Sequence, residues 1–61
     1  MDGKQVIKIL KKHGWELDTI EGSHHIMIKD GIRVPVTVHG HKDLKIGTFK
    51  DIEKRTGVKL K

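Results

Sequence analysis

The sequence predicts an α+β fold in which two helices cover one face of a three-stranded antiparallel sheet. Three observations predict it. Apolar residues recur at helical spacing near both ends of the chain, the apolar spacing changes to two between them, and Asp30-Gly31 stands in that middle region as a hairpin turn. The 61 residues leave room for one domain, covering residues 1–61, with its elements in the order α-β-β-β-α.

Residues 2–13 are predicted to form an amphipathic helix. Lysines occupy much of its circumference, and the apolar positions at helical spacing are Val6, Ile7, Ile9 and Leu10. Asp2 is the candidate N-cap, and Gln5 three residues later completes a capping-box pattern. Gly14 suits the left-handed position that ends a helix.

Three strands are predicted after this helix, over residues 15–21, 24–29 and 32–38. Gly22 and Ser23 form the first turn. Asp30-Gly31 forms the second, and this dipeptide is typical of a two-residue type I′ turn because both positions need positive φ. Pro35 has no backbone N–H to donate, which favours an edge position or a bulge for the third strand.

Alternation along these strands assigns their side chains to faces. The valines of the third strand share one face, and so do the isoleucines of the second: Val34, Val36 and Val38, and Ile26 and Ile28. Both sets are expected to face the core. His24 shares the face of the isoleucines and is expected at the rim of the core, whereas His25, on the face of Lys29, is expected to be more exposed.

A second helix is predicted from about residue 48 to residue 56. Thr48 and Asp51 are its candidate caps, and a short apolar stripe follows them. Gly57 suits the left-handed position beyond its last turn.

Composition bounds the class of partner. Thirteen Lys and Arg against eight Asp and Glu give a net charge of +5, which favours an anionic partner such as nucleic acid. The chain has no cysteine, so neither a disulfide framework nor thiolate chemistry is expected, and a cytoplasmic location is the simplest interpretation. No apolar run approaches the roughly 20 residues that a membrane span needs, so no membrane partner is expected.

Four of the five histidines flank the ends of the second and third strands: His24, His25, His39 and His41. The hairpin brings the start of one strand beside the end of the other, so these imidazoles are expected to converge. An imidazole can transfer a proton near neutral pH or bind a metal. Three interpretations stay open: catalysis or substrate contact, a metal site, and a solvated rim without a role. The metal site is the least favoured, because the set lacks the Cys or carboxylate ligands common in structural zinc sites.

Two stretches are candidate binding elements. In the first turn, Gly22 lets a backbone approach a ligand and Ser23 adds a hydroxyl beside an imidazole, although an ordinary polar turn fits equally well. Before the second helix, Lys42 and Lys45 lead towards Thr48 and the free N–H groups of a helix start, which favour an anion. This arrangement predicts a phosphate seat, and the alternative is a loop whose lysines are only solvated.

Four stretches of the sequence follow one another in a specific order: Gly22-Ser23-His24-His25, Val34-Pro35-Val36, His39-Gly40 and Lys42-Asp43-Leu44-Lys45-Ile46-Gly47-Thr48. Their order and spacing resemble the HicA family of toxin ribonucleases. The resemblance implies a small fold like the double-stranded RNA-binding domain, cleavage of messenger RNA, and neutralisation by a HicB-type antitoxin. It also implies that His24, the histidine of Gly-Ser-His, is catalytic.

The sequence departs from the pattern of that family in two places. Thr37 and Val38 separate Val-Pro-Val from His39, where many members reach the histidine directly, and Ile46 stands where a proline often precedes Gly-Thr. The first departure affects the register of His39, and the second leaves the helix entry less rigid. Neither touches the turn that carries His24.

The leading hypothesis is a toxin that acts as a metal-independent endoribonuclease. His24 is expected to assist attack of an RNA 2′-hydroxyl on the adjacent phosphodiester. The residues expected to contact RNA are Gly22, Ser23, His25, Lys42, Lys45 and Thr48. No cofactor and no metal are expected. The alternative is a non-catalytic RNA-binding module of the same fold, which needs its lysines but not His24.

Overall fold

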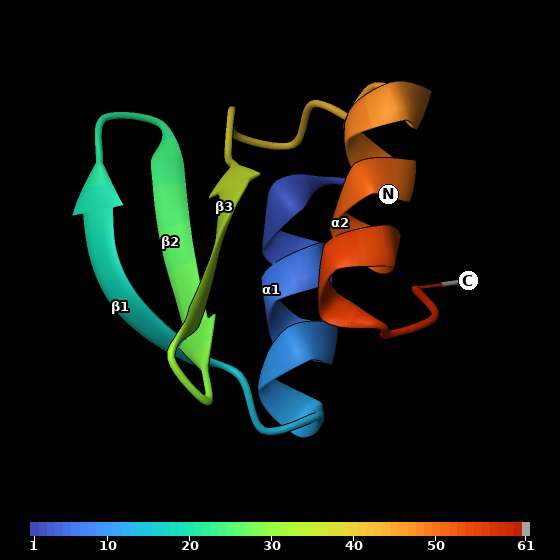
Figure 1. Ribbon diagram of the computed structural model, residues 1–61. Coiled ribbons are helices and arrows are strands. Elements are labelled where there is room, and N and C mark those ends of the chain that lie inside the picture. Colours follow the sequence, from blue (N-terminus) through green and yellow to red (C-terminus); the bar gives the residue numbers. More distant parts are fainter. Residues whose placement is uncertain (61) are drawn as a thin grey trace.

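The computed structural model describes residues 1–60, and Lys61, the last residue of the predicted domain, lies outside the described residues. Its elements are α1 (Gly3–Lys12), β1 (Glu16–Glu21), β2 (His24–Lys29), β3 (Ile32–Thr37) and α2 (Ile46–Thr56). The strands form one antiparallel sheet in the order β1-β2-β3, and both helices lie on the same side of it (Figure 1). The predicted α+β fold class is therefore confirmed.

The limits of α1 follow from its sequence. The Asp2 side chain accepts a hydrogen bond from the Gln5 backbone N–H, and the Gln5 side chain accepts one from the Asp2 N–H, both at 2.9 Å. This is the predicted capping box. At the other end Gly14 has φ +89°, and Lys29 Nζ donates to the His13 carbonyl oxygen at 2.8 Å. The helix thus ends at a glycine and is docked on β2.

The β2–β3 hairpin sets the register of the sheet. Asp30 and Gly31 have φ +51° and +78°, as a two-residue type I′ turn requires. Lys29 therefore stands opposite Ile32, and the pairing continues without a break to the other end of the hairpin. The predicted turn is confirmed, and so is the edge position of the strand that contains Pro35.

The prediction for the faces of β2 was wrong. Met27 is fully buried, whereas Ile26 and Ile28 are only half-buried. The reason is the hairpin register, which places Met27 opposite the buried Val34 and therefore on the same side of the sheet. The isoleucines, together with His24, lie on the side that no helix covers.

The core lies between the sheet and the two helices. Its buried hydrophobic residues are Val6, Leu10, Trp15, Met27, Val34, Val36, Ile52, Val58 and Leu60. Both helices contact β3, and β1 lies at the far edge of the sheet, as Figure 1 shows. Leu17 and Ile20 of β1 therefore stay exposed although they stand opposite core-facing positions of β2. Neither helix within residues 1–60 has the length and apolar character needed to cross a membrane.

The start of α2 also differs from the prediction. The helix begins at Ile46 with Lys45 as N-cap, and no side chain caps it, so neither Thr48 nor Asp51 has that role. Thr48 lies instead in the first turn of the helix. The end is as predicted: Gly57 has φ +71° and donates its N–H to the Glu53 carbonyl oxygen at 2.8 Å.

Candidate functional site

The turn between β1 and β2 presents His24 at one end of the sheet. Gly22 adopts φ +60°, and the space that a side chain there would enter is open. The Val38 N–H donates to the Ser23 carbonyl oxygen at 2.7 Å, which fastens the turn to the end of β3. His24 stands opposite Thr37 of β3 and is exposed. Its imidazole is thus held at a fixed strand position and is open to solvent.

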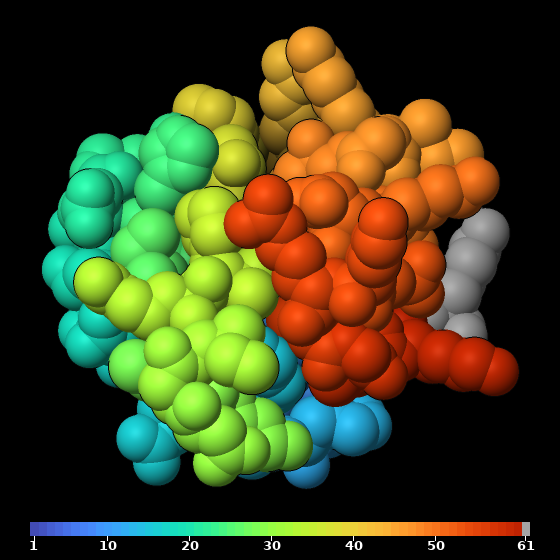
Figure 2. All heavy atoms as spheres, in the orientation of Figure 1, coloured from blue at the N-terminus to red at the C-terminus, as the bar shows by residue number. Residues whose placement is uncertain are grey.

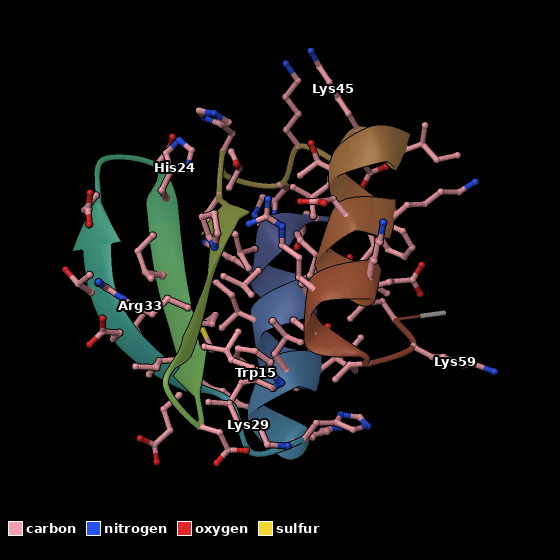
Figure 3. The ribbon with its side chains drawn as sticks, viewed as in Figure 1. Trp15, His24, Lys29, Arg33, Lys45 and Lys59 are labelled. Carbon is pink, nitrogen blue, oxygen red and sulfur yellow. The ribbon has the colours of Figure 1, made fainter. Side chains whose placement is uncertain are left out.

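A pocket of about 320 Å³ lies beside this strand end. Its lining residues are Thr37, His39, Lys42, Asp43, Leu44, Lys45 and Thr48. Figure 2 shows it as a notch between the end of β3 and the segment that leads into α2. Thr37, the cross-strand partner of His24, forms one wall. His24 and Lys45 accordingly lie at the same end of the molecule (Figure 3).

The electrostatics of this pocket favour an anion. Lys42 and Lys45 are exposed in its wall, and the first turn of α2 contains no acidic residue. Backbone N–H groups of that turn have no partner within the helix, and the helix dipole adds partial positive charge. Asp43 opposes this charge in part, but its Oδ1 lies 3.1 Å from the Met1 amino group. Arg33 contributes no free cation, because it pairs with Asp18 at 2.6 Å.

The chain before α1 supports the pocket loop, which the sequence did not predict. The Leu44 N–H donates to the Met1 carbonyl oxygen at 3.0 Å, and Asp2 forms an isolated antiparallel bridge with Asp43. Gly3 packs so tightly on β3 that a Cβ there would overlap the carbonyl oxygen of Thr37. Residues 1–3 therefore brace both the loop that carries the lysines and the strand end opposite His24.

His25 occupies a different environment from His24. It stands opposite the buried Val36, on the core side of the sheet, and it is half-buried. Its Nδ1 is buried without a hydrogen-bond partner among the described residues. The expectation that His25 would be the more exposed of the two was wrong, for the same reason as the faces of β2.

The predicted histidine cluster is brought together only in part. The strand ends that carry the histidines do meet, but His24 and His25 lie on opposite faces of β2. Within residues 1–60, no group of three or more His, Asp and Glu side chains could hold a metal ion. Among the residues expected to contact RNA, three line one pocket, namely Lys42, Lys45 and Thr48. Gly22 and Ser23 lie in the adjoining turn, whereas His25 faces the core.

Thr37 is a site residue that the sequence reasoning missed. A signal for it was present, because a two-residue turn at Asp30-Gly31 places residue 37 opposite residue 24.

Comparison with protein families gives one finding. A family model described as HicA toxin of bacterial toxin-antitoxin matches residues 3–58, which include all five elements, the turn before β2 and every residue that lines the pocket. Comparisons with curated proteins and with solved structures give no match.

Proposed function

The chain belongs to the HicA family of toxins of bacterial toxin-antitoxin systems, and from this premise we propose that it is a metal-independent endoribonuclease that cleaves messenger RNA. The observation that carries the proposal is the position of His24. It is an exposed imidazole on the side of the sheet that no helix covers, and its cross-strand partner Thr37 lines a pocket that two lysines and a helix start make favourable for phosphate. Cleavage of a phosphodiester by this route needs a proton-transfer group close to a phosphate-binding site.

The proposed reaction uses the ribose as its own nucleophile. His24 accepts the proton of the 2′-hydroxyl, the oxygen attacks the adjacent phosphorus, and the bond from phosphorus to the 5′ oxygen breaks. The products are a 2′,3′-cyclic phosphate and a free 5′-hydroxyl. The departing oxygen must gain a proton, and a lysine or His39 of the pocket wall, or a water molecule, can supply it. Lys42, Lys45 and the start of α2 hold the phosphates.

The same surface is the proposed target of the antitoxin. Family membership implies a toxin-antitoxin partner, and we infer a HicB-type protein that covers the surface bearing His24. A cationic pocket in a chain of net charge +5 favours a partner with carboxylates on its facing surface. Covering that surface would block RNA without altering the toxin chemically.

Cleavage of RNA in excess chelator tests the nuclease. The wild-type chain is expected to cleave, and His24→Ala is expected to lose about 10² to 10⁴ in rate, the usual worth of positioned acid/base catalysis. Its thermal melt should stay near the wild-type value, since His24 is exposed. Its retention of RNA should also stay near the wild-type value, since Lys42, Lys45 and the start of α2 hold the phosphates. His13→Ala is the matched control: it removes an exposed histidine from the end of α1, outside the site, and should cleave normally.

The outcomes separate the competing functions. Equal cleavage by His24→Ala would remove His24 from the mechanism. Retention of RNA without cleavage by the wild-type chain would identify a non-catalytic RNA-binding module, in which Lys45→Ala weakens binding and His24→Ala does not. Activity that appears only when zinc is restored would identify a metal-dependent enzyme.

A further inference from the structure

A second hollow adjoins the pocket, and most of its lining is apolar. Its volume is about 480 Å³, and it is lined by Met1, Gln5, Leu44, Ile46 and Phe49. We call it the Ile46 groove. Its residues come from the chain around the start of α1, the loop before α2, and the first turns of α2. Leu44 lines both the groove and the cationic pocket, so the two hollows share a wall.

Ile46 does not belong to the hydrophobic core. Its side chain is 73% exposed, the highest value among the large hydrophobic residues that the structure describes. The core-facing side of α2 is formed by Ile52, which is buried, and Phe49, which is half-buried. Ile46 and Met1 are the exposed apolar residues of the groove, and exposed apolar side chains around a hollow are typical of protein–protein contact sites.

The charges around the groove indicate which kind of partner binds there. Lys42 and Lys45 flank the shared wall, the Asp43 carboxylate between them is paired with the Met1 amino group, and no acidic residue stands in the first turn of α2. A partner with carboxylates beside an apolar side chain would complement both hollows. RNA would gain little in the groove, because Gln5 carries its one polar side chain and uses Oε1 in the capping box, and the Met1 amino group is already paired with Asp43. A second copy would bring together two chains that each carry a net charge of +5.

We propose that the Ile46 groove is the anchor site of the antitoxin. An aliphatic or aromatic side chain of the antitoxin fills the groove, and neighbouring carboxylates pair with Lys42 and Lys45. The inference takes its partner from the proposed function but does not depend on RNA cleavage. In this interface the apolar anchor supplies most of the affinity, and the charges set orientation and association rate. The antitoxin thus contacts the Ile46 groove as well as the cationic pocket.

The test compares two isoleucines in the full chain. Ile46→Ser removes the anchor contact, and Ile32→Ser removes an isoleucine that is 55% exposed at the hairpin end of β3. Calorimetric titration with the cognate antitoxin should give a dissociation constant at least about tenfold weaker for Ile46→Ser and within about twofold of wild type for Ile32→Ser. Both free variants should melt near the wild-type temperature, because both side chains project into solvent.

Several results would overturn the assignment. Unchanged antitoxin affinity for Ile46→Ser, or an equal loss in both variants, would remove the groove from the interface. Weaker RNA retention by Ile46→Ser with unchanged antitoxin affinity would assign the groove to RNA, and a dimer of the free chain that Ile46→Ser dissociates would assign it to self-association. A wild-type chain that leaves RNA intact but binds antitoxin through Ile46 would refute the nuclease and leave the groove standing.

Discussion

The side chain of His24 is exposed because the alternate residues that follow it in β2 are paired with buried residues of β3. Met27 and His25 face Val34 and Val36 across the hairpin, and these two valines are buried. Since side chains alternate along a strand, the same pairing turns His24 away from the helices. A shift of one residue in the register would bury His24 and expose Met27. The position of the candidate catalytic group therefore depends on the hairpin turn at Asp30-Gly31.

Substitution of Met27 tests this assignment of faces. Met27→Ala is expected to lower the free energy of unfolding by about 2–5 kcal/mol, because it leaves a cavity in a fully buried position. Ile28→Ala, on the half-buried opposite face, is expected to cost clearly less. Urea unfolding at 25 °C measures both. Met27→Leu, which conserves volume, should keep the fold and lose less than about 1.5 kcal/mol, so a failure of Met27→Ala to fold remains interpretable. A larger loss for Ile28→Ala than for Met27→Ala would contradict the assignment.

The error in predicting these faces has a physical origin. The run Ile26-Met27-Ile28 is apolar on both sides of the strand, so composition alone cannot choose the buried side. The number of isoleucines favoured the wrong side. The correct information was in the turn, because a two-residue hairpin that pairs Lys29 with Ile32 fixes every later pair. When the two disagree, the strand pairing decides which face of a strand is buried, and the number of apolar residues on each face does not.

At the scale of elements, the site is built from the ends of helices and strands. The end of β3, the loop after it and the first turn of α2 form the pocket, and the start of α1 closes on them. Local sequence patterns correctly predicted the start of α1, the ends of both helices and the β2–β3 turn. The capping box, Gly14, the hairpin and Gly57 are all where they were expected. The start of α2 was missed because no side chain caps it. The bracing by residues 1–3 was missed because it is a contact between segments far apart in sequence.

Two glycines at helix starts are expected to respond oppositely to the same substitution. Gly3→Ala would force a Cβ into the Thr37 carbonyl oxygen and to 2.9 Å from Val38 Cγ2, so we expect a loss of about 1–3 kcal/mol in the free energy of unfolding. At Gly47 the same Cβ would meet nothing within 4 Å. Gly47→Ala should be neutral or stabilise by up to about 1 kcal/mol. Urea unfolding of both variants is the measurement.

The pair also tests how the site is supported. If residues 1–3 brace the strand end opposite His24, Gly3→Ala should lower RNA cleavage even at temperatures where the variant is fully folded. A Gly3→Ala variant as stable as wild type would show that α1 does not pack on β3 as described.

At the scale of the whole molecule, the cationic pocket and part of the negative charge lie in different places. The pocket lies at the end of β3, whereas three of the eight acidic residues lie on β1 at the far edge of the sheet, and one of these, Asp18, reaches across the sheet to pair with Arg33 of β3. A net charge of +5 on so short a chain also opposes its own compaction. A partner that neutralises the pocket therefore removes repulsion as well as covering the site.

A chain of 61 residues has a small core and only modest stability of its own, so binding should dominate its behaviour. A partner that binds only the folded toxin stabilises it by mass action, by about 2.7 kcal/mol when the free partner is at 100 times its dissociation constant. For a domain of this size that corresponds to a rise in Tm of roughly 10–20 °C. Thermal melts at increasing concentrations of antitoxin measure the rise, which should be smaller at high salt because the pocket contributes through charge. The melt of Ile46→Ser should rise less at the same antitoxin concentration, and a toxin melt that saturating antitoxin leaves unchanged would mean that the antitoxin does not act by binding the folded toxin.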